Sequence, residues 1–293
     1  MIKIKNGEYE YDTYYELGSG SLGKIYHCRR TKDGKELAVK MIKKDFIRKH
    51  KDYGLLLLEK EIIIRKIATK SGLPFFVRLY DSFSDGIYIY MILEKCEMSM
   101  HDFVNKRELS EDHCLEMIFQ IGLGLKYLYS IDASYRNIKT QNILIKDGIL
   151  KITDFECATK SCIKTSELKP NLYMAPELFK DSEQPYTSKI DVWALNTCLY
   201  YFLTKNYYFN KKIPAELKKQ VFTKTFELDK KYKFSKELKD LLKCGYEKKP
   251  EKRLSISEYL GHPVFKKFKE KYNVYINISM TGIGNRNNQF QNH

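Results

Sequence analysis

Three glycines near the start of the chain have the spacing G-x-G-x-x-G, at Gly18, Gly20 and Gly23. Glycine-rich turns let backbone amides approach a phosphate group without a clash from a side chain. Dinucleotide-binding folds use the same spacing, but there the last glycine opens a helix. The residues that follow here, 24–28 (KIYHC), are typical of a strand instead. The pattern therefore favours a phosphate-binding turn between two strands.

Lys40 could contact the same phosphates. It ends the strand-like segment 37–40 (LAVK), 22 residues after Gly18. A single lysine in a lysine-rich chain is most often an exposed surface residue. Only the position of Lys40 after the glycine turn favours contact with the α and β phosphates of a nucleotide.

Strands make up most of the chain around these residues. Alternating apolar and polar side chains predict strands at 7–20, 24–30, 35–44, 76–83 and 86–95. One helix is expected at 55–67, where apolar residues fall on more than one face, so this helix is at least half buried. Residues 1–95 are therefore predicted to form a strand-rich lobe.

A helix-rich region follows this lobe. Apolar residues at three-to-four spacing predict a helix over 111–130, and Ser110 followed by acidic residues is a helix N-cap signal. Residues 142–155 are typical of a hairpin around Asp147 and Gly148. We expect the helical lobe to span 96–268 and the polar, asparagine-rich end of the chain to form a C-terminal tail, 269–293.

Several further motifs occur in a definite order along the chain. They are 135–142 (YRNIKTQN), 154–156 (DFE), 173–177 (YMAPE), 191–195 (DVWAL) and Arg253. With the glycine turn and Lys40, they resemble the eukaryotic protein kinase domain of the Ser/Thr type, over about residues 10–268. The resemblance implies an α+β fold with two lobes, a small β-rich N-lobe and a larger helical C-lobe.

The resemblance also implies roles for individual residues. Glu61 would pair with Lys40, with Glu59 as the nearby alternative, and Arg253 would pair with Glu177. The adenine ring would lie at Ile25, Ala38, Leu93, Glu94, Cys96 and Leu144. Asn142 and Asp154 would hold Mg²⁺ through oxygen ligands. Lys139 would be the lysine of the catalytic loop. The implied cofactors are therefore ATP and Mg²⁺.

Three positions depart from the family pattern. Asn137 stands where kinases have the aspartate that orients the substrate hydroxyl and accepts its proton, and a neutral amide cannot take that proton. Pro170 stands where Ser/Thr kinases have a threonine that bridges this aspartate and the loop lysine. Glu156 replaces a glycine, which restricts the backbone and adds negative charge near a metal, unless its carboxylate points to solvent.

These departures predict an ATP- and Mg²⁺-binding pseudokinase that acts as a scaffold or allosteric regulator. One alternative is a weakly active Ser/Thr protein kinase that transfers the ATP γ-phosphate to protein hydroxyls, because phosphoryl transfer depends largely on positioning and electrostatics. A second alternative is a structural subunit of a large assembly that uses the kinase fold as a docking body.

The composition and the apolar pattern exclude several classes of protein. Hydrophobic residues are 43% of the 293 residues, which excludes a wholly disordered chain. The strongest apolar run, 55–64, is interrupted by charged residues and is far shorter than the roughly 20 residues that span a membrane, and the first ten residues lack the apolar region of a signal peptide. Seven cysteines without a C-x-x-C pair predict free thiols in a reducing compartment, hence a cytoplasmic protein.

The net charge of +15 comes mainly from 43 lysines, against 9 arginines. A solvated lysine-rich surface is the simpler interpretation, because phosphate recognition tends to favour arginine. The alternative is an anionic partner, such as a microtubule, a nucleic acid or a membrane surface, with cytoskeletal association as a consequence. The basic clusters that could bind it are 43–51, 211–219, 230–233 and 266–271.

Overall fold

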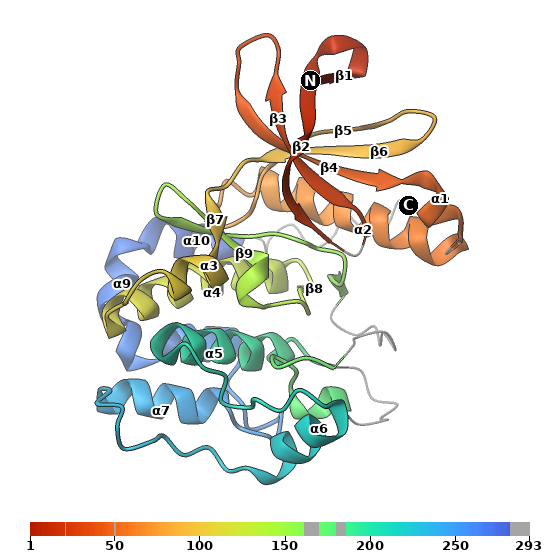
Figure 1. Ribbon diagram of the computed structural model, residues 1–293. Coiled ribbons are helices and arrows are strands. Elements are labelled where there is room, and N and C mark those ends of the chain that lie inside the picture. The colour runs from red at the N-terminus through yellow and green to blue at the C-terminus, as the bar shows by residue number, and fades with distance from the viewer. Residues whose placement is uncertain (21, 50, 161–169, 180–185, 282–293) are drawn as a thin grey trace. The chain divides into compact units, whose positions relative to one another are not determined.

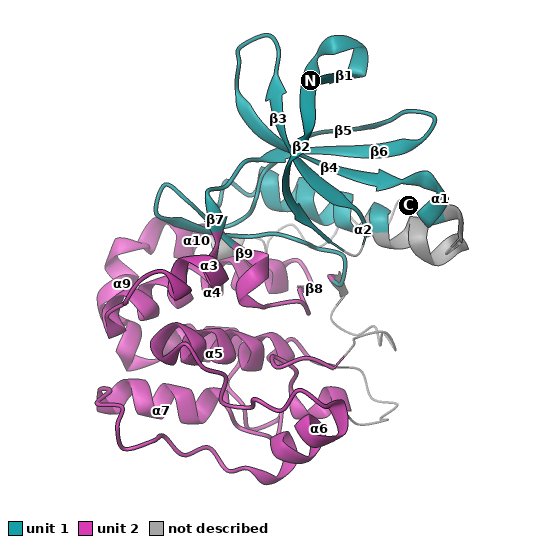
Figure 2. Ribbon diagram, viewed as in Figure 1, with its two compact units in different colours: residues 1–98, 144–157 teal, residues 99–143, 158–293 magenta. Residues whose placement is uncertain are grey.

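The computed structural model describes the chain except residues 21, 50, 161–169, 180–185 and 282–293. It contains two compact units (Figure 2). The first unit comprises residues 1–98 and 144–157, and the second comprises residues 99–143 and 158–293. The segment 144–157 therefore belongs with the N-terminal residues.

A six-stranded antiparallel sheet forms most of the first unit (Figure 1). Its spatial order is β1 (Ile2–Ile4), β2 (Tyr9–Ser19), β3 (Lys24–Arg30), β4 (Glu36–Lys43), β6 (Tyr88–Glu94) and β5 (Leu79–Ser84). The other elements are a 3₁₀ turn (Lys5–Gly7), α1 (Lys44–Lys49), α2 (Lys51–Lys70), and the hairpin of β9 (Ile143–Lys146) and β10 (Ile149–Ile152). β7 (Met98–Ser99) lies at the boundary of the two units.

Side chains alternate between the two faces of the sheet along β4, and this alternation determines the face on which Lys40 lies. Successive side chains of a strand face opposite sides of its sheet. Leu37, Val39 and Met41 enter one core cluster, with Cys28 and Ile92. The even-numbered neighbours of Lys40, which are Ala38 and Ile42, enter the other cluster together with Leu58 of α2. Lys40 therefore projects on the α2 side of the sheet.

Helices make up most of the second unit. They are α3 (Met100–Asn105), α4 (Glu111–Ser130), α5 (Lys189–Thr204), α6 (Pro214–Thr223), α7 (Lys236–Gly245), α8 (Ile256–Gly261), α9 (Lys266–Lys271) and α10 (Asn273–Thr281). Short 3₁₀ helices occur at Thr140–Asn142, Pro176–Phe179 and Pro263–Phe265, and β8 (Ala133–Ser134) pairs with β11 (Thr159–Lys160). Trp193 of α5 is fully buried and packs against the rings of Phe209 and Tyr246.

Most of the predicted elements are confirmed. α4 has the predicted bounds, and the Ser110 side chain accepts a hydrogen bond from the N–H of His113 as an N-cap. The hairpin turns at Asp147 and Gly148, with φ of 52° and 73°. α2 begins at Lys51, four residues before the predicted start, and β1 and α1 were not predicted. The α+β class inferred from the resemblance is confirmed.

The segment 269–293, predicted to be a tail, begins with packed structure. Tyr272 is buried, and its hydroxyl contacts Glu116 at 2.8 Å and the Gln120 side-chain amide at 2.9 Å. α10 follows it, and residues 282–293 lie outside the described residues. Helix α4 therefore anchors the first part of this segment.

The six cysteines that the structure describes are free thiols, as predicted, and Cys162 lies outside the described residues. Within the described part of the chain, no helix combines the length and the apolar character that crossing a membrane requires.

Candidate functional site

Lys40 and Glu61 form a buried ion pair in the first unit. The Lys40 Nζ lies 3.0 and 3.2 Å from the two carboxylate oxygens of Glu61, and the two side chains are 3% and 0% exposed. Arg65, one helical turn further along α2, donates to Glu61 Oε1 from Nη2 at 2.7 Å and from Nε at 2.9 Å. Glu59, the alternative partner in the sequence, is exposed. The helix therefore presents Glu61 to Lys40.

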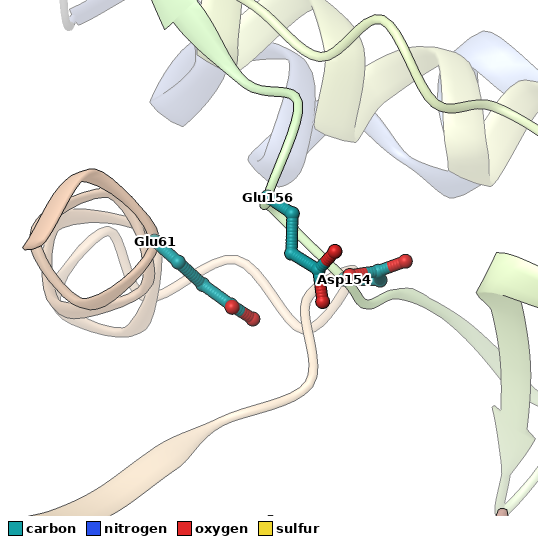
Figure 3. Close-up of side chains that lie close together, drawn as sticks. All are labelled: Glu61, Asp154 and Glu156. Carbon is teal, nitrogen blue, oxygen red and sulfur yellow. The ribbon is translucent and has the colours of Figure 1, made fainter. Parts of the chain in front are cut away.

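Two further carboxylates approach Lys40 from the segment after β10. Glu156 Oε1 lies 3.0 Å from the Lys40 Nζ, and Asp154 Oδ1 lies 3.9 Å from it. Figure 3 shows the carboxylates of Glu61, Asp154 and Glu156 close together. The Glu156 side chain is only 8% exposed, so its carboxylate does not point to solvent. Lys40 is therefore the cation at the centre of three acidic side chains.

The pKa values of this cluster follow from burial and charge. Burial by itself would raise the pKa of Glu61, but Lys40 and Arg65 lower it to about 2. Burial raises the pKa of Asp154 to about 6, an effect that Lys40 opposes and Glu156 supports. Burial disfavours the charged form of Lys40, yet Glu61, Glu156 and Asp154 outweigh it and raise the Lys40 pKa. Lys40 and Glu61 are therefore both charged at neutral pH.

The glycine run forms a turn between β2 and β3, as predicted. Gly18 pairs with Ile25 across the two strands, and the N–H of Gly20 donates to the carbonyl oxygen of Gly23 at 2.8 Å. A Cβ atom added at Gly20 would lie 3.6 Å from Glu156 Oε1. The turn therefore lies directly beside the Glu156 carboxylate.

Gly23 has a structural role that can be tested without any ligand. A Cβ atom at Gly23 would lie 2.0 Å from the carbonyl oxygen of Met41, whereas one at Gly18 meets nothing within 4 Å. Because overpacking a close backbone contact costs about 1–3 kcal/mol, we expect Gly23→Ala to lower the free energy of unfolding by that amount. Gly18→Ala is the matched control and should change it by less than about 0.5 kcal/mol. Urea denaturation measures both, and equal losses would contradict this account.

The residues predicted to contact adenine all lie in the first unit. Ala38 and Leu93 are buried in the core cluster on the α2 side of the sheet. Ile25, Cys96 and Leu144 are partly buried and pack against that cluster. The Glu94 carboxylate lies 3.1 Å from the Lys151 Nζ and 3.4 Å from the Lys146 Nζ. Burial would raise the Glu94 pKa, but Lys151 and Lys146 lower it.

The loop that carries Asn137 is held by Asp191 of α5, within the second unit. The Asp191 carboxylate accepts the backbone N–H of Tyr135 at 2.9 Å and that of Arg136 at 2.7 Å. Arg136 has a φ of 66°, a left-handed conformation that costs free energy in a non-glycine residue. The Asn142 side-chain amide donates to the carbonyl oxygen of Asn137 at 3.0 Å. These bonds stabilise the conformation of the loop.

The Asp191 carboxyl group should also make stability depend on pH. Burial outweighs its hydrogen-bond donors and raises its pKa from an ordinary 3.8 to about 6. The stability that it contributes is therefore complete below about pH 4 and is lost as the pH rises through about 6.

In Asp191→Asn, one of the two backbone N–H donors loses its acceptor. We therefore expect the free energy of unfolding at pH 5 to fall by about 1–3 kcal/mol relative to the native chain. The difference in the free energy of unfolding between the variant and the native chain should shrink by on the order of 1 kcal/mol between pH 5 and pH 7. The reason is that only the native chain has the Asp191 carboxyl group, whose contribution to stability is lost over this range. Urea denaturation at the two pH values measures this difference. A difference that widens with pH would refute the assignment.

Asn137 and Lys139 line a cavity of about 30 Å³ in the second unit, whose wall also includes Asn171, Tyr173 and Met174. The Tyr173 hydroxyl lies 2.9 Å from the hydroxyl of Thr140, the residue after Lys139 in this loop. Pro170, one residue before that wall, is exposed. The loop that carries Asn137 therefore packs against the segment that ends in the YMAPE motif.

The predicted pair between Glu177 and Arg253 is confirmed. The Arg253 guanidinium donates to both carboxylate oxygens of Glu177, at 2.7 and 3.0 Å.

Sequence reasoning missed Arg65 and the contact of Glu156 with Lys40. The spacing of four residues between Glu61 and Arg65 could have indicated the first, whereas the second joins residues 116 positions apart and gave no local signal.

The predicted site residues fall into two groups. The glycine turn, the adenine residues, Lys40, Glu61 and Asp154 belong to the first unit, and Asn137, Lys139 and Asn142 belong to the second. Carboxylate and amide oxygens such as those of Asp154 and Asn142 are ligands that Mg²⁺ prefers. The Asp154 side chain is 22% exposed, so a cation can reach this carboxylate of the first unit.

Comparisons with known proteins agree with the motifs. Residues 11–265 match the family model described as "Protein kinase domain". The chain is similar to an Aurora kinase of Debaryomyces hansenii (32% identical, over 84% of this chain and 60% of the relative). It is also similar to calcium-dependent protein kinase 5 of Plasmodium falciparum (29%, over 96% and 50%) and to serine/threonine-protein kinase PLK4 of Xenopus tropicalis (31%, over 84% and 26%). The chain thus spans about half the length of the calcium-dependent protein kinase and 60% of the length of the Aurora kinase.

Proposed function

Because the chain belongs to the protein kinase family, we propose that it is a pseudokinase, which binds ATP with Mg²⁺ but transfers phosphate poorly or not at all. Asn137 carries this proposal, because it stands at the position of the catalytic base. Its amide can orient a hydroxyl group but cannot accept the proton. Loss of general base catalysis is worth about 10²–10⁴-fold in rate.

The nucleotide would be held mainly by the first unit. The backbone of the glycine turn would cover the phosphates, and Lys40, oriented by Glu61, would contact them. Asp154 and Asn142 would hold Mg²⁺, which when bound neutralises charge on the phosphate oxygens. Because these groups are present while the base is not, the bound nucleotide would serve to order the protein. The role that follows is scaffolding or allosteric control.

The second candidate is a slow but genuine Ser/Thr kinase. The Lys40–Glu61 pair, which active kinases need in place, has a distance of 3.0 Å in this chain. The relatives are themselves described as kinases. Because phosphoryl transfer depends mostly on positioning and electrostatics, loss of the base need not abolish turnover.

Two assays on the purified chain separate these candidates. A thermal shift with ATP and Mg²⁺ should stabilise the native chain, and Asp154→Asn should abolish the shift; no shift at millimolar nucleotide would defeat the proposal. Radiolabelled autophosphorylation should be absent in the native chain. Clear turnover that Lys40→Met abolishes would instead establish the second candidate. Asn137→Asp shows whether the base alone is missing.

A docking role for the lysine clusters is compatible with both candidates. If the net charge of +15 serves a partner and is not simply a solvated surface, that partner would present an anionic surface, such as a microtubule or nucleic acid, to a cytoplasmic protein. Co-pelleting at 50 and 200 mM salt tests this, because contacts to such a surface weaken steeply with salt. Binding that is insensitive to salt, or no binding at the lower salt, would count against it.

A further inference from the structure

The ammonium group of Lys40 is surrounded by the protein's own carboxylates. A lysine has three N–H donors and no acceptor. Three carboxylate oxygens lie within hydrogen-bond distance of the Lys40 Nζ: two from Glu61, at 3.0 and 3.2 Å, and Oε1 of Glu156 at 3.0 Å. A phosphate oxygen that binds Lys40 must therefore share the ammonium with these groups or replace one of them.

Glu156 is the carboxylate that a phosphate would meet first. Glu61 is fully buried and is also held by Arg65. Glu156 Oε1 instead lies 3.6 Å from the Cβ position of Gly20, at the glycine turn. This oxygen therefore lies next to both groups proposed to hold the phosphates, Lys40 and the turn. All of these residues belong to the first unit.

We propose that the Glu156 carboxylate is a built-in competitor of nucleotide phosphate for Lys40, so that ATP binds only when Glu156 leaves the ammonium. The inference rests on the proposed nucleotide binding and concerns its regulation. A ligand with adenine and ribose but no phosphate has no need of Lys40. The competition therefore acts against nucleoside triphosphates and not against nucleosides.

The size of the effect depends on how often Glu156 leaves Lys40. Apparent affinity falls in proportion to the fraction of molecules that are competent to bind. An ion pair with side chains 3% and 8% exposed is shielded from solvent screening, so the competent fraction is small. Even when displaced, a glutamate beside the triphosphate repels it. We expect ATP affinity to rise about tenfold or more when the charge of Glu156 is removed.

The test compares two ligands on three forms of the full chain. Isothermal titration calorimetry measures the dissociation constants of ATP with Mg²⁺ and of adenosine for the native chain, Glu156→Gln and Glu8→Gln. Glu8→Gln removes one charge from an exposed ion pair of the same unit. We expect about tenfold or tighter ATP binding in Glu156→Gln only, and equal adenosine binding in all three. Glu156→Ala, which cannot hydrogen-bond Lys40 at all, should show the same gain as Glu156→Gln or a larger one.

Other outcomes overturn the inference in different ways. Equal ATP affinity in the native chain and both Glu156 variants would refute the competition and leave the proposed nucleotide binding intact. A parallel gain for ATP and adenosine would show that the substitution reshapes the adenine site, which also refutes it. If no form binds ATP, the proposed function fails and the inference fails with it.

Discussion

Arg253→Ala is expected to lower the free energy of unfolding by about 3–5 kcal/mol, the range for breaking a buried ion pair by removing one partner. The Arg253 side chain is 0% exposed and bonds both oxygens of Glu177. It also donates to the carbonyl oxygens of Glu247 and Lys189, at 2.8 and 3.0 Å, and lies over the Trp193 ring. Alanine would leave the Glu177 carboxylate, 13% exposed, without its cation.

A pair with a half-exposed arginine is the control. Arg29 binds Glu10 at 2.7 Å, and the Arg29 side chain is 50% exposed although that of Glu10 is only 11% exposed. Because solvent screens the Arg29 guanidinium, Arg29→Ala should cost less than Arg253→Ala. Arg253→Lys should recover only part of the loss, because an ammonium group cannot make the two parallel bonds of a guanidinium. Urea denaturation at pH 7 measures all three variants. Equal losses for Arg253→Ala and Arg29→Ala would show that burial adds nothing to this pair.

Local patterns in the sequence predicted the elements that depend on local interactions. The helix at 111–130 has an N-cap serine, and the hairpin has Asp147-Gly148 at two positions with positive φ. Both signals act within a few residues, so they can be read without knowing the rest of the fold. The short β1 and α1, of 3 and 6 residues, have too few residues to show a period. The start of α2 was missed for a different reason, because its first four residues, 51–54 (KDYG), include two charged residues and a glycine and do not extend the apolar pattern.

Contacts between distant segments determine what the sequence could not decide at the site. Glu59 and Glu61 are both plausible partners of Lys40 by position. Only the packing of α2 on the sheet makes Glu61 the partner and leaves Glu59 exposed. The sequence likewise left open whether Glu156 points to solvent. Its contact with Lys40 spans 116 residues and is a property of the folded first unit.

Glu61→Gln is expected to lower the free energy of unfolding by about 3–5 kcal/mol at pH 7. The Glu61 carboxylate is 0% exposed and accepts hydrogen bonds from both Lys40 and Arg65. An amide of the same shape turns N–H donors toward one of these cations and leaves Arg65, 1% exposed, without a counter-charge. Glu59→Gln, on the exposed face of the same helix, is the control and should change stability by less than about 0.5 kcal/mol.

The pH dependence separates loss of charge from loss of packing in Glu61→Gln. The folded-state pKa of Glu61 is about 2, below its ordinary value of 4.5, because Lys40 and Arg65 outweigh burial. A lowered pKa stabilises the fold above about pH 4.5, and this stabilisation is lost as the pH falls toward 2. At about 1.36 kcal/mol per pKa unit, the contribution at pH 7 is about 3 kcal/mol. Urea denaturation at pH 5 and 3.5 should show the difference between the native chain and Glu61→Gln shrinking by about 1 kcal/mol, and a difference that stays constant would assign the whole loss to packing.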